Sequence, residues 1–227
     1  MKTWKEIWKN RSLNDIEDTT LNHQALIKLN GFDAPSSHIP LSSLALWQEQ
    51  LKRELRIDIA DSVYEVGCGS GGFLYNLYKQ GFHIGGCDIS ESLINYAKEA
   101  LPKGKWEITS ANNININRWD HVLSFSVFHY LTPSEAKETL LRMIMKAKHS
   151  VAILDINNAM KEEAFENHRS EIYENYAERY KDLKQTYYHK SWWIDILDSL
   201  GVNYRIYDQD IQNYEIGKFR YNIIILL

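Results

Sequence analysis

The chain has 227 residues, with 26 lysines and arginines against 30 aspartates and glutamates, and a formal net charge of -4 at pH 7. This length suits one domain with additions to a single core. The basic residues are scattered along the sequence and form no stripe of the kind that neutralises phosphates. We therefore expect no nucleic acid among the partners.

The sequence also bears on location and redox chemistry. The first residues contain no apolar h-region, and no later run reaches the roughly 20 apolar residues of a membrane span, so we expect a cytoplasmic protein without a membrane partner. Cys68 and Cys87 cannot form a disulfide framework, and neither stands near another cysteine or a histidine at metal-ligand spacing. Both should be reduced, and no metal is predicted. The chain could be a monomer or a homodimer.

Short apolar runs alternate with amphipathic stretches, which is typical of βαβ units around a parallel sheet. The predicted strands are residues 63–66, 83–88, 106–109, 121–125, 150–156, 203–207 and 220–226. The predicted helices between them are residues 72–79, 92–100, 134–148 and 191–200. Thr132 to Glu135 supplies the third helix with a capping box and a proline at its first position.

The last two predicted strands are separated only by residues 208–219, which show no clear helical pattern for a crossover. This spacing indicates an antiparallel pair that closes the sheet. We therefore expect an α/β fold with a Rossmann-like, seven-stranded, mostly parallel sheet, an antiparallel last strand and helices on both faces.

The most specific stretch is residues 63–74, VYEVGCGSGGFL, an apolar strand that runs into a glycine-rich turn and then a helix. Glycines allow a sharp turn and a close ligand approach, and the helix offers unpaired N–H groups. Gly67, Gly69 and Gly72 satisfy G-x-G-x-x-G, and Asp88 ends the next strand where it could bond a ribose hydroxyl. These features alone fit a nicotinamide enzyme equally well.

Glu65, two positions before the first glycine, argues against a nicotinamide cofactor. Its carboxylate suits the ammonium group of a methionine moiety and would be an awkward neighbour for a pyrophosphate. The pattern Glu65-x-Gly67-x-Gly69-x-Gly71 resembles the first motif of the class I S-adenosylmethionine-dependent methyltransferases. The resemblance extends over residues 63–227 and looks closest to the small, stand-alone enzymes that methylate metabolites. It implies S-adenosylmethionine as the cofactor.

The resemblance also implies a set of cofactor-binding residues. These are Glu65, Gly67, Cys68, Gly69, Gly71, Asp88, Ile89, Ser110, Ala111, Asn112 and Ser126. Asp88 is implied to hold both ribose hydroxyls, residues 110–112 to lie beside the adenine, and residues 124–128 to follow the methionine. Family members often place an acid near the adenine amino group, where this chain has Ser110 or Asn112. The adenine contact is therefore expected from an asparagine side chain or from the backbone.

A single methyltransferase domain is expected to have four parts. They are a helical N-terminal cap (residues 1–60), a cofactor-binding half (61–156), a helical lid insertion after the fifth strand (157–190) and the C-terminal part of the sheet (191–227). An insertion that follows a strand lies at the edge where open α/β sheets bind ligands. The cap and the insertion are candidate lids, or else additional packing layers.

Methyl transfer from a sulfonium mainly requires two reactants in line and water excluded, and such positioning contributes roughly 7 to 11 kcal/mol. A general base is optional and adds roughly a hundredfold to ten-thousandfold. His129, just after the fourth strand, is the best-placed candidate, and Tyr130 is a weaker one. Alternatively, His129 bonds a nearby carbonyl and orders the loop.

A second group of candidates concerns the methyl acceptor. Arg169, Tyr173, Tyr176 and Tyr180 recur at three- and four-residue spacing and are expected to share one helix face. That face would offer phenol rings to a cationic acceptor and a guanidinium to a carboxylate or phosphate, or it would pack on the sheet. Arg220, which opens the last strand, is a further candidate for acceptor contact.

The sequence thus predicts an enzyme that transfers a methyl group from S-adenosylmethionine to an oxygen or nitrogen atom of a small-molecule metabolite. Three alternatives stay open. They are an NAD(P)-dependent oxidoreductase on the same fold, a methyltransferase that acts on a macromolecule, and a cofactor-binding protein without catalysis.

Overall fold

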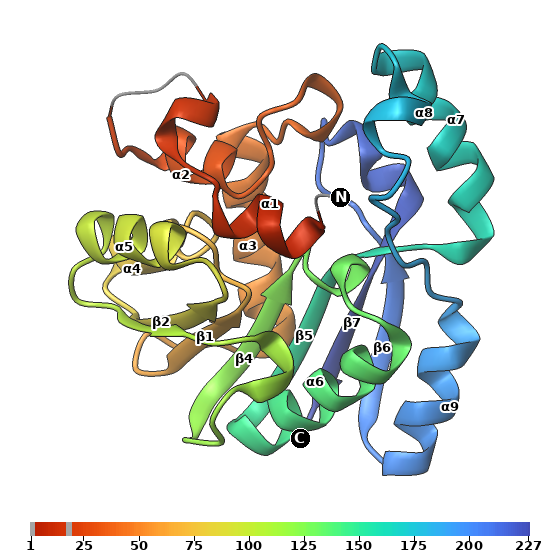
Figure 1. Cartoon of the computed structure of the whole chain (residues 1–227). Helices are drawn as coiled ribbons and strands as arrows, with labels where there is room; N and C mark the ends of the chain where they lie inside the picture. Colours follow the sequence, from red (N-terminus) through yellow and green to blue (C-terminus); the bar gives the residue numbers. More distant parts are fainter. Residues whose placement is uncertain (1–2, 17–19) are drawn as a thin grey trace.

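A computed structural model describes residues 3–16 and 20–227. Seven strands form one sheet in the order β3-β2-β1-β4-β5-β7-β6, as Figure 1 shows in part. Their bounds are β1 (Ser62–Val66), β2 (His83–Asp88), β3 (Lys105–Ile108), β4 (Trp119–Phe125), β5 (Ala147–Asn157), β6 (Asn203–Asp208) and β7 (Arg220–Leu226). Only β7 pairs antiparallel with its neighbours. The expected fold, with its antiparallel last strand, is confirmed.

Helices cover both faces of this sheet. The α-helices are α1 (Trp4–Lys9), α2 (His23–Leu29), α3 (Leu41–Leu55), α4 (Tyr75–Gln80), α5 (Glu91–Ala100), α6 (Pro133–Lys146), α7 (Glu162–Ile172), α8 (Tyr176–Arg179) and α9 (Lys190–Leu200). Short 3-10 helices comprise Leu13–Ile16, Pro35–Ser37, Ala111–Asn113, Phe128–Tyr130, Ala159–Lys161 and Glu215–Phe219. Among the described residues, no helix is both long and apolar enough to cross a membrane.

Alternation along the strands builds two cores, because successive side chains of a strand point to opposite faces. Val63 and Leu123 pack on one face with buried residues of α3 and α4. Tyr64 and Val122 pack on the other face with buried residues of α6 and α9. A smaller cluster joins α2 to Leu93 of α5. The sheet therefore lies between two helical layers, and the N-terminal segment extends the first layer.

Two helix boundaries differ from the sequence prediction by more than one residue. The helix expected from residue 72 begins at Tyr75, and residues 72–74 form a turn. Gly72 lies so close to the α2 backbone that a Cβ there would be 2.9 Å from the amide nitrogen of Ile27. The helix expected over 134–148 ends at Lys146, because Ala147 has extended backbone angles and pairs with Trp119 in the sheet.

The described part of the N-terminal segment is largely helical, as expected, and residues 1–2 and 17–19 of the predicted cap lie outside the described residues. The single helix face expected after the fifth strand was wrong. Helix α7 ends at Ile172, and Asn175 adopts a left-handed conformation (φ 53°) before α8 begins. The chain folds back there, so Arg169 lies 4.9 Å and 4.5 Å from the ring centroids of Tyr176 and Tyr180.

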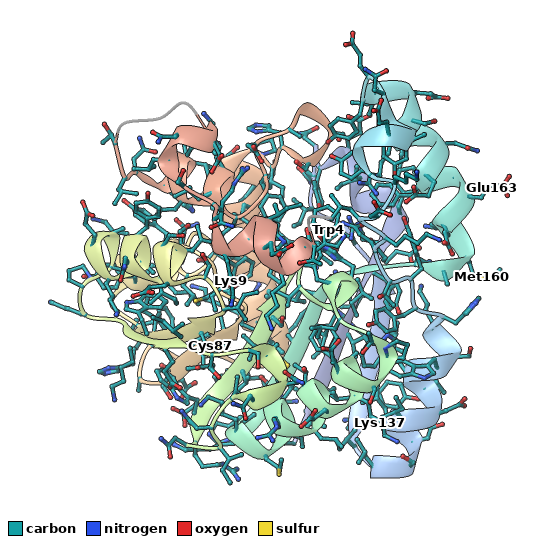
Figure 2. The ribbon with its side chains drawn as sticks, in the orientation of Figure 1. Trp4, Lys9, Cys87, Lys137, Met160 and Glu163 are labelled. Carbon is teal, nitrogen blue, oxygen red and sulfur yellow. The ribbon has the colours of Figure 1, made fainter. Side chains whose placement is uncertain are left out.

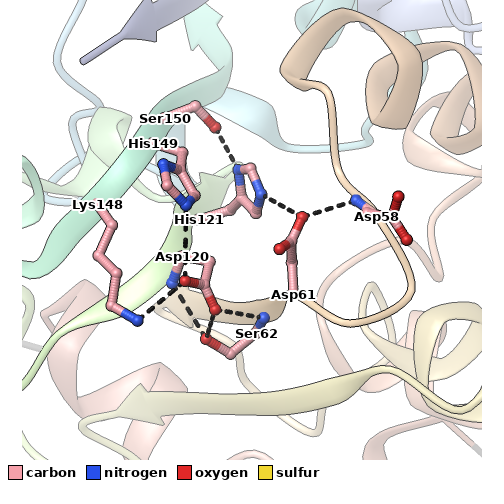
Figure 3. Close-up of polar contacts among 8 residues, drawn as sticks. All are labelled: Asp58, Asp61, Ser62, Asp120, His121, Lys148, His149 and Ser150. Atoms are coloured by element: carbon pink, nitrogen blue, oxygen red, sulfur yellow. Dashed lines mark hydrogen bonds and ion pairs between the residues drawn. The ribbon is translucent and has the colours of Figure 1, made fainter.

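A polar network fixes the opposite edge of the sheet, where β1 and β4 begin (Figure 3). The His121 ring contacts Ser150 Oγ through Nδ1 (2.7 Å) and Asp61 Oδ2 through Nε2 (3.1 Å). The order Ser-His-Asp has the composition of a hydrolytic triad. However, Ser150 is buried within β5, where no acyl group could reach its hydroxyl. The network therefore joins the loop before β1 to β4 and β5.

Replacement of Ser150 by alanine tests this structural assignment. The change leaves His121 Nδ1 without its partner, so we expect a loss of roughly 1–3 kcal/mol in the free energy of unfolding, measured by urea denaturation. The exposed Ser199→Ala variant serves as the control and should unfold like the wild type. Unchanged stability together with lost activity in Ser150→Ala would contradict a purely structural role.

Candidate active site

The glycine-rich loop after β1 depends on glycine at three positions, because Gly67, Gly69 and Gly71 all have positive φ angles. Gly67 and Gly69 have φ angles of +75° and +52°, in the left-handed region that other residues avoid. A Cβ on Gly67 would lie 2.4 Å from Val127 Cγ2, and one on Gly69 would lie 2.3 Å from Asn30 Oδ1. The loop thus fits tightly between the segment after β4 and the N-terminal segment.

Asn30, at the end of α2, holds this loop through three hydrogen bonds. Its Nδ2 donates to the carbonyl oxygen of Cys68 (3.1 Å). Its Oδ1 accepts from the Ser70 amide (2.8 Å) and the Ser70 hydroxyl (2.9 Å). The N-terminal segment is therefore part of the loop's support. The sequence analysis did not predict this role of Asn30. The two partners are 40 residues apart in the chain, and local sequence spacing gives no sign of such a contact.

The loop forms one wall of a cavity of about 330 Å³, here called the glycine-loop cavity. Nine of the residues predicted to bind cofactor line it: Glu65, Gly67, Gly69, Asp88, Ile89, Ser110, Ala111, Asn112 and Ser126. Cys68 and Gly71 do not. The Cys68 side chain is buried against Gly86, and Gly71 faces Leu101.

Two carboxylates line this cavity, the buried Glu65 and the half-buried Asp88. Glu65 is 1% exposed, and its Oε2 has no hydrogen-bond partner in the described part of the chain. Burial, with a smaller effect of Asp88, raises the pKa of Glu65 well above its ordinary value. Burial also raises the pKa of Asp88, although its oxygens accept from the Gly69 (3.0 Å) and Ser90 (2.9 Å) amides. A cationic ligand group would give Glu65 the partner it lacks.

A second cavity of about 280 Å³, here called the arginine cavity, adjoins the first. The two share six lining residues: Trp4, Trp8, Asn30, Phe32, Ser126 and Tyr130. Among the predicted acceptor and catalytic residues, those that line it are His129, Tyr130, Arg169, Tyr173, Tyr180 and Arg220. Tyr176 does not, because its phenol donates to Glu166 instead. Arg11 and Ser36 also line this cavity and were not predicted.

Helix α1 covers both cavities at the edge where the parallel strands end (Figure 1). The rings of Trp4 and Trp8 lie 5.1 Å and 5.6 Å from the ring of Tyr130. The indole nitrogen of Trp4 donates to the carbonyl of Lys184 (3.1 Å) in the insertion after β5. Figure 2 labels Trp4 in this central position. The N-terminal segment and the insertion therefore meet over the site.

His129 is buried, and its Nδ1 accepts a hydrogen bond from Arg220 Nη1 (3.1 Å). Burial, followed by the charges of Arg220 and Arg169, lowers the pKa of His129 well below its ordinary value. The ring is therefore neutral, and the lone pair of Nδ1 is already engaged. Burial raises the pKa of Tyr130 to about 12, so its phenol keeps its proton at neutral pH.

Ser126 lies between the two cavities in a strained conformation. Its φ angle is 59°, which is costly for a residue with a Cβ and recurs at functional sites. Its amide donates to the carbonyl of Leu154 (3.0 Å), which fixes the turn after β4. The serine is thus held where β4 ends, on the wall that both cavities share.

Comparison with known proteins relates part of the chain to methyltransferases. Residues 63–147 match the family model described as "Methyltransferase domain". Protein 235L of Invertebrate iridescent virus 6, whose name gives it as a methyltransferase candidate, is 30% identical over 152 residues, which are 60% of this chain and 54% of that protein. The chain spans about half the length of the curated relatives it matches.

Solved structures agree on the fold. Magnesium protoporphyrin IX methyltransferase from Synechocystis PCC 6803, solved with bound SAH, has a TM-score of 0.62 at 13% identity and covers 98% of this chain and 95% of its own. The plantazolicin methyltransferase BpumL has a TM-score of 0.60 at 16% identity and covers 82% of both chains. The protein has the fold of the class I S-adenosylmethionine-dependent methyltransferases. Within this fold, residues 63–147 are the part that matches the methyltransferase domain family.

Replacement of Glu65 by glutamine should stabilise the ligand-free protein near pH 7. Folding raises the pKa of Glu65, so the stability it contributes is present below its ordinary pKa of 4.5 and is lost as the pH rises through the folded value. We expect the melting temperature to rise by a few degrees, since about 1 kcal/mol corresponds to roughly 2–4 °C at this size.

The pH dependence of stability distinguishes removal of the Glu65 charge from an unspecific stabilising effect of the substitution. The advantage of Glu65→Gln over the wild type should shrink as the pH falls toward 4.5, in calorimetry without ligand. The exposed Glu99→Gln variant on α5 should show no such trend. A Glu65→Gln variant that is less stable than the wild type at pH 7 would refute the claim that this carboxylate is an unsatisfied buried charge.

Replacement of Asn30 by alanine should loosen the glycine loop, because the Ser70 amide and the Cys68 carbonyl lose their partner. We expect faster hydrogen exchange in residues 67–71 and at least a tenfold loss of affinity for S-adenosylhomocysteine, measured by calorimetry. The exposed Asn95→Ala variant on α5 is the control. Equal exchange rates in this loop for Asn30→Ala and the wild type would rule out the support role.

Proposed function

We propose that the protein transfers a methyl group from S-adenosylmethionine to an oxygen or nitrogen atom of a small-molecule acceptor. One observation carries the proposal: two cavities of opposite character adjoin along the wall formed by Ser126 and Tyr130. The glycine-loop cavity would hold the cofactor, and the arginine cavity would hold the acceptor. The family match and the fold support this arrangement.

The residues of the glycine-loop cavity suit this cofactor. The unpaired carboxylate of Glu65 fits an ammonium group, and the carboxylate of Asp88 fits the ribose hydroxyls. Asn112 and the backbone of residues 110–111 would contact the adenine. When bound, S-adenosylmethionine supplies an electrophilic methyl group on a sulfonium. The protein's part is to orient this group and to exclude water.

The remaining catalytic contribution in this proposal is positioning. His129 is a poor general base, because Arg220 occupies its Nδ1 lone pair and the ring lies in a buried, cationic environment. We assign it the role of orienting Arg220. Tyr130 keeps its proton and offers a hydrogen-bond donor at the shared wall. Trp4 and Trp8 cover the same wall and keep water out.

A small acceptor is favoured over a macromolecule by the size and cover of the arginine cavity. Its volume is about 280 Å³, near the lower end for small-molecule pockets, and α1 with its tryptophans lies over it. A nicotinamide cofactor is disfavoured by Glu65, whose buried carboxylate would face a pyrophosphate.

Ligand binding tests the proposal directly. S-adenosylmethionine or S-adenosylhomocysteine at about 100 times its Kd should add roughly 2.7 kcal/mol to the stability of the folded state, a rise of roughly 5–11 °C in Tm. The Asp88→Ala variant should lose most of this rise, and Glu99→Ala should keep it. A rise with NADH alone would refute the cofactor assignment.

Turnover is followed with S-adenosylmethionine labelled in its methyl group. Label should appear in the small-molecule fraction when the protein is incubated with a metabolite extract. Label in RNA or protein would favour a macromolecular acceptor instead. Strong cofactor binding with no labelled product from any extract would favour a binding protein without catalysis.

A further inference from the structure

We propose that Arg220 and Arg169 bind an anionic group, a carboxylate or a phosphate, on the methyl acceptor. This inference rests on the proposed function and specifies the class of its substrate. The anionic group binds at the arginine end of the cavity and positions the acceptor there. The atom that receives the methyl group then lies toward the wall with Ser126 and Tyr130. The acceptor is therefore a small anion with a second, nucleophilic group.

Arg220 is a buried cation without a matching carboxylate. The residue is 3% exposed and lines the arginine cavity. Its Nη1 donates to His129, and its Nε has no partner in the part of the chain that the structure describes. No carboxylate among the described residues forms an ion pair with it. A buried charge is costly unless it is paired, so an anionic group of a bound ligand would supply the partner that Arg220 lacks.

The buried carboxylate of Asp155 on β5 does not meet this need. Its oxygens accept from the Tyr214 hydroxyl (3.0 Å) and from the Gln209 amide (3.4 Å). The Asp155 backbone adopts φ 63° at an irregularity in the β5–β7 pairing, and its amide donates to Asn222 (2.9 Å). The carboxylate is held within this network and forms no ion pair with Arg220.

Arg169 brings a second guanidinium to the same cavity. Its Nη1 lies 3.3 Å from Glu166 Oε1, and the phenols of Tyr176 and Tyr187 also donate to Glu166. One carboxylate thus serves three donors. Both guanidiniums contact the ring of Phe165, at 5.5 Å for Arg169 and 4.9 Å for Arg220, so the two cations lie near one another. A guanidinium pair of this kind suits an oxyanion with several acceptor sites.

The other charges on the cavity wall cancel. Arg11 also lines the cavity, but it pairs with Asp33 at 2.7 Å, and both belong to the same wall. His129 accepts a hydrogen bond from Arg220, and its lowered pKa keeps the ring neutral. Among the described residues, Arg220 is therefore the cation of this wall that no carboxylate pairs with, while Arg169 shares Glu166 with two phenols. The aromatic residues of this wall, among them Phe32, Phe165 and Tyr173, suit a planar body on the acceptor.

Four small probes that share a phenyl ring test the inference: benzoate, phenyl phosphate, neutral benzamide and cationic benzylamine. Their binding to the full chain is measured by ligand-observed NMR at constant ionic strength, with and without S-adenosylhomocysteine. We expect at least one anion to bind tenfold or more tighter than benzamide and benzylamine. The relative affinities of benzoate and phenyl phosphate show whether the site prefers a carboxylate or a phosphate.

Variants locate the binding. Arg220→Gln and Arg169→Gln should each weaken the preferred anion at least tenfold, and the exposed Arg53→Gln on α3 should leave it unchanged. If Arg220→Gln fails to fold, Arg220→Lys takes its place, because it keeps the charge and loses the two-pronged geometry. Anion binding that is equal in wild type and in Arg169→Gln, or equal for benzoate and benzamide, overturns the inference.

The two proposals fail separately. If S-adenosylhomocysteine stabilises the protein but no anion is preferred, the substrate class is wrong and the cofactor assignment stands. If the anion binds through Arg169 and Arg220 but neither sulfur nucleotide binds, the anion site stands and the proposed function falls. Once turnover is found, Arg169→Gln should raise KM for the anionic acceptor far more than it lowers kcat.

Discussion

The site depends on how the sheet reverses its order. Strands β1 and β4 lie side by side, although the connections that follow them leave toward opposite edges of the sheet. At such a switch point no crossover helix covers the carboxyl ends of the two strands, and a crevice forms there. The glycine loop closes one side of this crevice and Ser126 the other, while Asn30 and α1 close it from above.

The two cavities of the crevice carry side chains of opposite charge. The glycine-loop cavity contains the buried carboxylate of Glu65 and the half-buried carboxylate of Asp88. The adjoining cavity contains Arg169 and Arg220. A cofactor with a sulfonium and an ammonium is complementary to the first cavity and repelled by the second, and an anionic acceptor has the reverse preference. Electrostatics of this kind orders two ligands in one crevice before any specific contact is made.

The sequence predicted those parts of the site that local pattern determines. The strand, the glycines and Asp88 lie within one βαβ unit, where spacing carries the information, and Glu65 follows from the same stretch. Asn30 could not be predicted, because its contact with Ser70 depends on how the N-terminal segment docks. The single helix face predicted for Arg169 to Tyr180 was wrong, because the left-handed backbone of Asn175 interrupts the helix that the periodicity implied. The residues nevertheless meet, through a fold-back that periodicity cannot describe.

The short length of α1 has a consequence for exchange of ligands. Six residues are too few for a helix to be stable alone in water, so α1 is retained by what its two tryptophans contact. Segments of this kind detach at a free-energy cost far below that of global unfolding. Because residues of the same helix line both cavities, one local detachment would open both cavities to solvent at the same time.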